Sequence, residues 1–358
     1  MIKRLFFSIG LACMAGMVFS CGSNGDQKSE EGSMSDTMTK DEVKLVANEA
    51  EKKVEVYMGD DLFTAYIYPD NIAKPVLYPI VTASGKSLTR GFPLDPMPGE
   101  RVDHPHHVGI WLNYGDVNGL DFWNNSEAIS AEKKSEYGTI YHKGIKKMEG
   151  NTLVVEAEWK DINGQVLLSE ETTYKFDSEG DSRNIYRETK LTAQDKKVDF
   201  TDNKEGMLGI RVTRAMELPS DKPAVFTDAA GNPTEVKELN NDGVNGNYLS
   251  SEGIEGDDVW GTRGKWMELY SNIDGDPVSI TVMDHPTNVG YPTYWHARGY
   301  GLFAANPLGQ KAMSGGKEEL NYSLDPGQSV TFRYNILVHS NSALSADQIN
   351  AKYAEFVK

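Results

Sequence analysis

One stretch of the chain, residues 101–123, combines proton carriers, carboxylates and aromatic rings at close spacing. It reads RVDHPHHVGIWLNYGDVNGLDFW and holds three of the seven histidines, His104, His106 and His107. An imidazole titrates near neutral pH, so it can both accept and donate a proton. A tryptophan, of which this stretch has two, offers an apolar face on which a sugar ring can stack. The combination indicates proton-transfer chemistry on a carbohydrate.

The pattern after Pro105 predicts a strand with two different faces, because successive side chains of a strand point to opposite sides. The polar and aromatic face would carry His107, Gly109, Trp111 and Asn113. The apolar face would carry Val108, Ile110 and Leu112. We expect the apolar face to meet the core and the polar face to form the floor of a cleft. The structural alternative is that the histidines bond to the backbone at a sheet edge and that Trp111 fills a second core.

A second segment, residues 284–298, again pairs histidine with proline and with tryptophan. If its end is a strand, His296 and Arg298 face one way and Trp295 faces the other. Two further segments, residues 209–214 and 250–266, supply additional arginines and tryptophans. Arginine binds carboxylates through two parallel hydrogen bonds, so it suits the anchoring of polar substrate groups.

We predict that these segments meet in one cleft. The predicted catalytic residues are His106, His107 and His296. The predicted substrate-binding residues are Arg101, Trp111, Asn113, Asp116, Arg211, Trp260, Trp295 and Arg298. Asp116 lies in the turn GDVNG, where its carboxylate could either bond sugar hydroxyls or form an Asx turn.

A divalent metal is another chemistry that the histidines allow. Zinc accepts imidazole and carboxylate ligands, so His106, His107 and His296 with one carboxylate could hold it. No spacing in the chain matches a strong metal motif, and we therefore predict no metal ligand and no cofactor, leaving a divalent metal as an open possibility. The chain has no GxSxG motif and no reactive cysteine, which argues against common acyl-transfer machinery.

The first residues predict export and attachment to a membrane. A basic start precedes an apolar run, residues 5–19, of the length typical of a signal peptide. Small and apolar residues directly before Cys21 resemble a bacterial lipobox, in which that cysteine is acylated. We predict a lipoprotein signal peptide at residues 1–20 and a flexible acidic tether at residues 21–45. The expected location is the Gram-negative cell envelope, with Cys21 anchored in the outer membrane and the protein either periplasmic or surface-exposed.

The rest of the chain predicts one all-β domain at residues 46–358. The formal net charge of −17 at pH 7 argues against nucleic acid as a partner. Apolar and polar residues alternate in many short runs separated by turn residues, which is typical of an antiparallel β-sandwich. Such runs include residues 54–58, 62–68, 153–159, 278–283 and 329–338. A single short helix is predicted at the C-terminus, capped by Ser345.

Several stretches between about residues 50 and 340 resemble the PmoA-like family of bacterial secreted proteins and lipoproteins. They read KPVLYPIVTASGKSLTRGFPL, PGERVDHPHHVGIWLNYGDVNGLDFW, YLSSEGIEGDDVWGTRGKW and HPTNVGYPTYWHARGYGLFAANPLG. The closing stretch, LDPGQSVTFRYNILVH, is similar to that of galactose-mutarotase-like sandwiches. The resemblance implies a supersandwich of antiparallel sheets whose concave face binds sugar. It implies no particular reaction and no catalytic residue.

The leading hypothesis is a lipid-anchored, carbohydrate-active enzyme that acts as an epimerase, lyase or hydrolase. His107 and His296 would be its acid/base pair, and His106 would assist. The alternative is a non-catalytic glycan-binding lipoprotein, which needs the tryptophans but not the histidines. A second alternative is a metal-dependent oxidoreductase, which only the histidine cluster favours. The expected partners are a carbohydrate ligand and, through Cys21, the bacterial membrane.

Overall fold

The computed structural model describes residues 40–358. The predicted signal peptide, Cys21 and most of the predicted tether lie outside these residues. The first strand, β1 (Val43–Asn48), begins inside the segment that was expected to be tether. No helix in the described part of the chain is long and apolar enough to cross a membrane.

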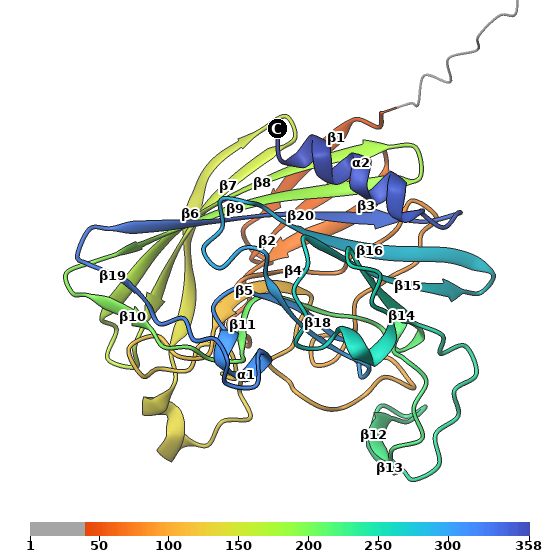
Figure 1. Cartoon of the computed structure of the whole chain (residues 1–358), viewed down its shortest axis with the longest axis horizontal. Helices are drawn as coiled ribbons and strands as arrows, with labels where there is room; N and C mark the ends of the chain where they lie inside the picture. The colour runs from red at the N-terminus through yellow and green to blue at the C-terminus, as the bar shows by residue number, and fades with distance from the viewer. Residues whose placement is uncertain (1–39) are drawn as a thin grey trace, which may run out of the picture. The chain divides into compact units, whose positions relative to one another are not determined.

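The first of two large sheets has eight strands in the order β1-β2-β3-β4-β5-β11-β18-β17, all paired antiparallel (Figure 1). After β1 come β2 (Lys53–Met58), β3 (Asp61–Ile67), β4 (Val76–Leu77), β5 (Ile110–Tyr114), β11 (Gly206–Arg211), β18 (Leu302–Asn306) and β17 (Tyr294–Arg298). The last four strands therefore bring the two predicted chemical segments, far apart in the sequence, into one continuous surface.

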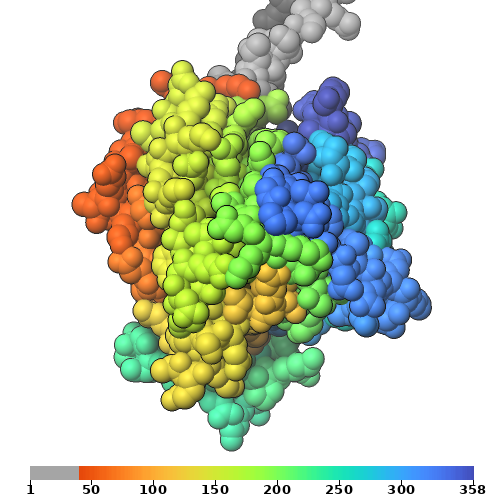
Figure 2. All heavy atoms as spheres, turned by 90° about the vertical axis from the view of Figure 1, so that its left-hand side faces the viewer, coloured from red at the N-terminus to blue at the C-terminus, as the bar shows by residue number. Residues whose placement is uncertain are grey.

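The second sheet also has eight antiparallel strands, in the order β14-β15-β16-β20-β9-β8-β7-β6. They are β14 (Asn247–Ser250), β15 (Trp266–Ile273), β16 (Asp276–Asp284), β20 (Ser329–His339), β9 (Ser182–Ala193), β8 (Val166–Glu179), β7 (Thr152–Lys160) and β6 (Thr139–Glu149). Burial alternates residue by residue along β7, as its alternating sequence predicts. Figure 2 shows the face where residues 139–193 (yellow to green) lie between N-terminal strands (orange) and C-terminal segments (blue).

The main core contains apolar side chains of both sheets, among them Phe63 and Ile110 from the first and Trp159 and Phe332 from the second. This arrangement confirms the predicted all-β sandwich. Two-stranded ribbons and short helices complete the connections. They are β10 (Val198–Phe200) with β19 (Tyr322–Leu324), β12 (Ala224–Thr227) with β13 (Pro233–Val236), η1 (Ala131–Glu136), η2 (Arg214–Met216), η3 (Gly256–Val259) and α1 (Gln310–Met313).

The predicted C-terminal helix, α2 (Ala346–Phe356), is present and packs on the second sheet. Ser345 caps it as predicted, in a reciprocal capping box with Gln348. Ile349 and Tyr353 form its buried stripe against Trp266 of β15. The helix therefore covers the second sheet and not the first sheet, which carries the candidate residues.

Candidate functional site

Four strands of the first sheet, β5, β11, β18 and β17, arrange the candidate residues in rows. Directly paired residues of antiparallel strands point to the same face of a sheet. One such row contains Trp111, Gly209, Ala304 and His296. The next row on this face contains Arg211, Leu302 and Arg298. The neighbouring residue Trp295 points into the main core, so the predicted alternation of Trp295 against His296 and Arg298 is confirmed.

Trp111 does not line a cleft, contrary to the prediction. It is fully buried in a second apolar cluster with Trp123, whose ring lies 5.0 Å away. The ring fits because β11 has Gly209 at this point, where an added Cβ would lie 2.4 Å from Cζ2 of Trp111. Trp111 stacks beneath the imidazole of His107 at 5.2 Å. The structural alternative, a second core, is therefore correct for this residue.

The predicted alternation of residues 107–113 holds only within β5. Ile110 and Leu112 belong to the main core, as expected. Val108 instead packs in the second cluster beside Trp111. The reason is Gly109, whose φ of +54° takes the chain out of the extended conformation between the two.

A cavity of about 420 Å³ opens over the rows and is called the histidine cavity here. It is lined by His104, His106, His107, Asn124, Lys204, Glu205, Trp260, His296, Arg298 and Tyr300. The structure thus brings all three predicted catalytic histidines together, from two distant parts of the chain. Two of the predicted binding residues, Trp260 and Arg298, also line the histidine cavity.

A second cavity of about 820 Å³, called the loop cavity, adjoins the first. The two cavities share Trp260, Arg298 and Tyr300. Arg101 lines the loop cavity, but its Nε donates to Oε2 of the buried Glu217 at 2.7 Å. The guanidinium of Arg101 is therefore committed to an ion pair and is only partly available to a ligand.

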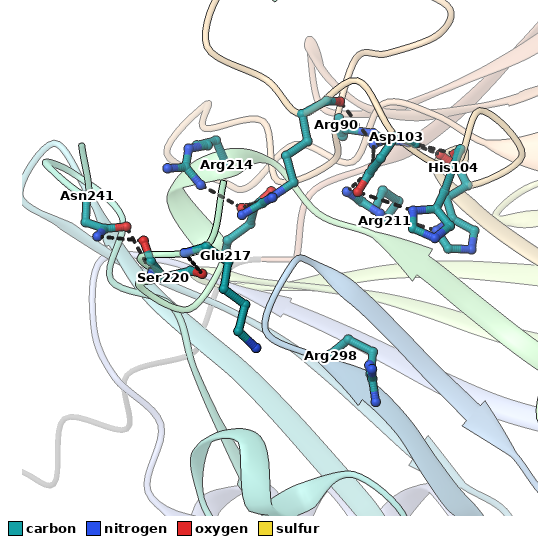
Figure 3. A network of polar contacts seen from close by, with 12 residues as sticks. Arg90, Asp103, His104, Arg211, Arg214, Glu217, Ser220, Asn241 and Arg298 are labelled. Atoms are coloured by element: carbon teal, nitrogen blue, oxygen red, sulfur yellow. Dashed lines mark hydrogen bonds and ion pairs between the residues drawn. The ribbon is translucent and has the colours of Figure 1, made fainter. Parts of the chain in front are cut away.

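Arg90 holds residues 101–107, called the HPHH loop here, in place (Figure 3). Its guanidinium is almost fully buried and donates to the carbonyl oxygens of Arg101, His104 and His107 at 3.0–3.1 Å. It also donates to Oδ1 of Asp103 at 2.6 Å. Such bonds satisfy loop carbonyls that no strand partner reaches. They also hold His104 in its uncommon conformation, with a φ of +42°.

Asp103 links the loop to the sheet. Its Oδ1 accepts from Arg211 as well as from Arg90, each at 2.6 Å, and its Oδ2 lies 3.2 Å from Nδ1 of His104 (Figure 3). Burial raises the pKa of the Asp103 carboxyl, but the bond to His104 and the charges of Arg211 and Arg90 outweigh it, so the pKa lies below its usual range. Arg211 is itself fully buried, so its predicted contact with substrate is wrong and its role is to position neighbours.

The hydrogen bonds of His107 and His296 fix opposite tautomers. A guanidinium can only donate, so Nδ1 of His107, 3.3 Å from Nη1 of Arg211, must accept, which places the ring proton on Nε2. A carbonyl can only accept, so Nδ1 of His296, 3.0 Å from the carbonyl oxygen of Lys204, must carry the proton. His107 can therefore donate through Nε2, whereas His296 can accept through Nε2.

His106, His107 and His296 are neutral at neutral pH. Burial lowers the pKa of His296 to about 4, against the opposing charge of Glu205. Burial, followed by the nearby His106 and Arg211, lowers the pKa of His107 well below its usual value. Burial and the charge of Lys74 lower that of His106 far below its usual range as well. The expectation that these imidazoles titrate near neutral pH is wrong, because the cavity is largely shielded from water and rich in cations.

This neutrality predicts loss of stability in acid. The folded pKa of His296 is about 4, below the ordinary 6.5, so the unfolded chain binds a proton more readily between those values. Stability is complete above pH 6.5 and falls as the pH approaches 4, by about 3 kcal/mol for this group. Between pH 7 and pH 4, the free energy of unfolding measured with urea should fall less in His296→Asn than in the wild type. An equal fall with pH in the two proteins would contradict the low pKa of His296.

Besides Trp111 and Arg211, three further predicted binding residues lie outside both cavities. Asn113 is buried and donates to the carbonyl of Phe122. Asp116 accepts from the backbone N–H of Gly119 at 2.9 Å, so the Asx-turn alternative describes it. Trp295 is fully buried in the main core. Their predicted contacts with substrate are wrong because strand pairing and turn formation already occupy these side chains.

Several site residues escaped sequence reasoning. Glu205 places Oε2 3.6 Å from Nδ1 of His296, and Tyr300 stacks on His104 at 5.2 Å. Lys74 is buried, donates to the carbonyl of His106 at 2.6 Å and lies 5.2 Å from the ring centre of Trp111. Burial lowers its pKa to about 7. No local sequence pattern signals such contacts, because they join segments that are distant in sequence.

A metal site gains no geometric support. Within residues 40–358, no group of three or more His, Cys, Asp or Glu side chains is arranged so that it could hold a metal ion. The histidines of the cavity instead pack against one another, with His106 and His107 ring centres 4.3 Å apart in an edge-to-face arrangement.

Comparison with known proteins gives a family and distant structural neighbours. Residues 53–354 match the model of a family of unknown function, DUF6807. No curated protein sequence matches the chain.

The chain is similar to several solved structures of carbohydrate-active proteins. The galactosidase domain of an alpha-galactosidase–sucrose kinase has 10% identity and a TM-score of 0.37, over 85% of this chain and 42% of that one. The alpha-galactosidase from Lactobacillus brevis has 13% identity and a TM-score of 0.31, over 88% and 41%. A galactose mutarotase related enzyme from Lactobacillus acidophilus has 9% identity and a TM-score of 0.33, over 84% and 98%. The chain spans about two fifths of the length of the two galactosidases.

Proposed function

We propose that this chain, which belongs to the DUF6807 family of unknown function, is a carbohydrate-active enzyme that uses two neutral histidines. The observation that carries the proposal is the pair formed by His107 and His296 in one cavity, held in opposite tautomers. One imidazole can donate and the other can accept through Nε2, which is the requirement for moving a proton across a bound sugar.

The acceptor in this scheme is Nε2 of His296, which no group within residues 40–358 occupies with a hydrogen bond. When it takes a proton from the substrate, the ring becomes a cation. The carboxylate of Glu205, 3.6 Å from Nδ1, then stabilises that charge. Nε2–H of His107 supplies a hydrogen bond to the substrate oxygen on which negative charge develops. These steps are common to epimerisation and elimination, and the acceptor also serves to activate water for hydrolysis.

Trp260 is the proposed sugar platform. It is the tryptophan of the site that remains accessible, with 36% of its surface exposed, and it lies where the two cavities meet. Trp260→Ala should weaken glycan binding by about 0.5–1.5 kcal/mol, the range of a lost aromatic contact, without lowering the unfolding free energy, because the ring supports no core. Calorimetric titration and urea unfolding measure the two quantities. Unchanged affinity would remove Trp260 from the site.

The direct test is to screen the purified protein against a panel of glycans and oligosaccharides and to record both binding and products. Turnover that is lost when His107 and His296 are both replaced by alanine supports the enzyme. A non-catalytic glycan-binding lipoprotein is the second candidate, and the exposed ring of Trp260 favours it. Binding without any product, retained after loss of the cavity histidines, would replace the first proposal with the second.

Anchoring belongs to the same proposal. Acylation at Cys21, residence in the Gram-negative outer membrane and the resemblance to PmoA-like proteins rest on the sequence alone and stay predictions. A tether of the predicted length would let a cavity reach glycans near the membrane surface.

A further inference from the structure

Arg298 differs from the other arginines of residues 40–358. Each of the others donates a hydrogen bond to a carboxylate, a carbonyl oxygen or a hydroxyl within this part of the chain. The guanidinium of Arg298 has no such partner there, and Figure 3 shows it apart from the bonded network around Arg90 and Arg214. The ring of Trp260 lies beside it, with its centre 5.5 Å from Cζ. Its five donors are therefore free.

Arg298 lies where a ligand bound in the cavities would meet its free donors. It lines both the histidine cavity and the loop cavity, so any ligand that extends from one into the other passes it. It follows His296 by two residues on β17, so both side chains stand on the same face of the sheet, with backbones about 7 Å apart. A group bound by Arg298 thus lies close to the proposed proton acceptor.

Within the histidine cavity, no carboxylate is left to match the charge of Arg298, whereas Asp103, Asp221 and Asp257 line the loop cavity. Glu205 is the carboxylate among the residues that line the histidine cavity, and Lys204 already pairs with it at 2.7 Å. Burial lowers the pKa of His106, His107 and His296, so these three rings carry no charge at neutral pH. The cavity therefore keeps a net positive charge inside a chain whose formal net charge is −17. Arg298 is exposed at this cavity, and its charge there attracts an anionic ligand and repels a cationic one.

We propose that the histidine cavity takes an acidic saccharide and that Arg298 binds the carboxylate of its sugar. This inference rests on the proposed function and names the substrate class of the same site. The planar guanidinium can bind a carboxylate through two parallel hydrogen bonds, and the face of Trp260 keeps that plane in place. A sugar with only hydroxyl groups would leave the charge of Arg298 unmatched.

Binding of the carboxylate also explains how His296 could act on carbon. When Arg298 neutralises the carboxylate, the C–H bond next to it becomes more acidic. The proton passes to Nε2 of His296, and the electron pair moves into the carboxylate, whose added charge Arg298 stabilises. Return of the proton to the opposite face gives an epimer, whereas departure of the group on the next carbon gives an unsaturated sugar. Both outcomes balance without an oxidant or a second substrate.

The test compares ligands that differ in charge alone. Oligosaccharides of galacturonate and of glucuronate are titrated into the purified full chain as free acids and as methyl esters. We expect the wild type to bind at least one free acid about 10- to 100-fold more tightly than its ester, the range of a charge-assisted hydrogen-bonded pair. The preference should shrink as salt is added. Arg298→Gln should lose this preference, and Arg298→Lys, which keeps the charge but not the planar fork, should keep part of it.

Arg333→Gln is the matched control, because Arg333 lies on β20 and pairs with Glu188 at 2.7 Å, away from both cavities. It should retain the full preference. Equal affinity of acid and ester for the wild type overturns the inference and needs no variant, so a folding defect in Arg298→Gln cannot hide the answer. Turnover of neutral glycans without any acid preference overturns the inference but leaves the proposed function intact. Binding of neither class overturns both.

Discussion

Replacing His296 with asparagine is expected to lower kcat by about 10²- to 10⁴-fold, the usual contribution of a positioned general base. The asparagine amide can still donate to the carbonyl of Lys204, as Nδ1 of His296 does at 3.0 Å. It offers no acceptor at the position of Nε2. The variant therefore keeps the local structure and loses only the proposed proton acceptor, so its melting temperature at pH 7 should stay close to that of the wild type.

The measurement is product formation on whichever glycan the panel identifies. His285→Asn is the matched control, since His285 is only half-buried and its Nδ1 bonds the hydroxyl of Thr287 outside both cavities. It should leave kcat unchanged. A folded His296→Asn protein with wild-type kcat would show that no proton moves through this imidazole.

The second large effect is expected at Arg90. Arg90→Leu should lower the free energy of unfolding by about 3–5 kcal/mol, the cost of breaking a buried ion pair by removing one partner. The carbonyl oxygens of Arg101, His104 and His107 would lose the donor that Arg90 supplies, although that of His104 keeps the N–H of His107. Asp103 would keep only Arg211 and His104. Because the loop carries three histidines of the cavity, turnover should fall along with stability.

Urea unfolding measures this loss, with Arg333→Leu as the comparison. Arg333 forms a partly exposed pair with Glu188, and such pairs contribute about 1 kcal/mol or less. Equal losses in the two variants would mean that Arg90 does not organise the loop. Arg90→Lys tests geometry, since a lysine keeps the charge but cannot serve both Asp103 and several carbonyls at once.

Local patterns were sufficient to predict the sandwich. The alternation in β7, β16 and β20 and the capping box at Ser345 depend on neighbouring residues, so the sequence displays them directly. The same is true of the opposite orientation of Trp295 and His296, which follows from strand alternation alone.

The composition of the site was harder to predict because it depends on which strands become neighbours. Trp295 and Trp111 were both placed in the cleft for their residue type, yet pairing turns one into the main core and buries the other beneath His107. The burial of Arg211 was equally hard to predict. Its guanidinium is fully buried because Asp103, from a loop distant in sequence, pairs with it. No local pattern distinguishes a buried, paired arginine from a free one such as Arg298.

The shared contacts of Asp103 restrict which amino-acid substitutions can accumulate in this protein during evolution. One carboxylate oxygen is shared by the guanidinium groups of Arg90 and Arg211. Replacing Asp103 alone would leave the guanidinium groups of Arg90 and Arg211 next to each other without a carboxylate between them. Replacing either arginine alone would leave buried hydrogen-bonding groups without a partner. Substitutions at these three positions should therefore covary among homologues.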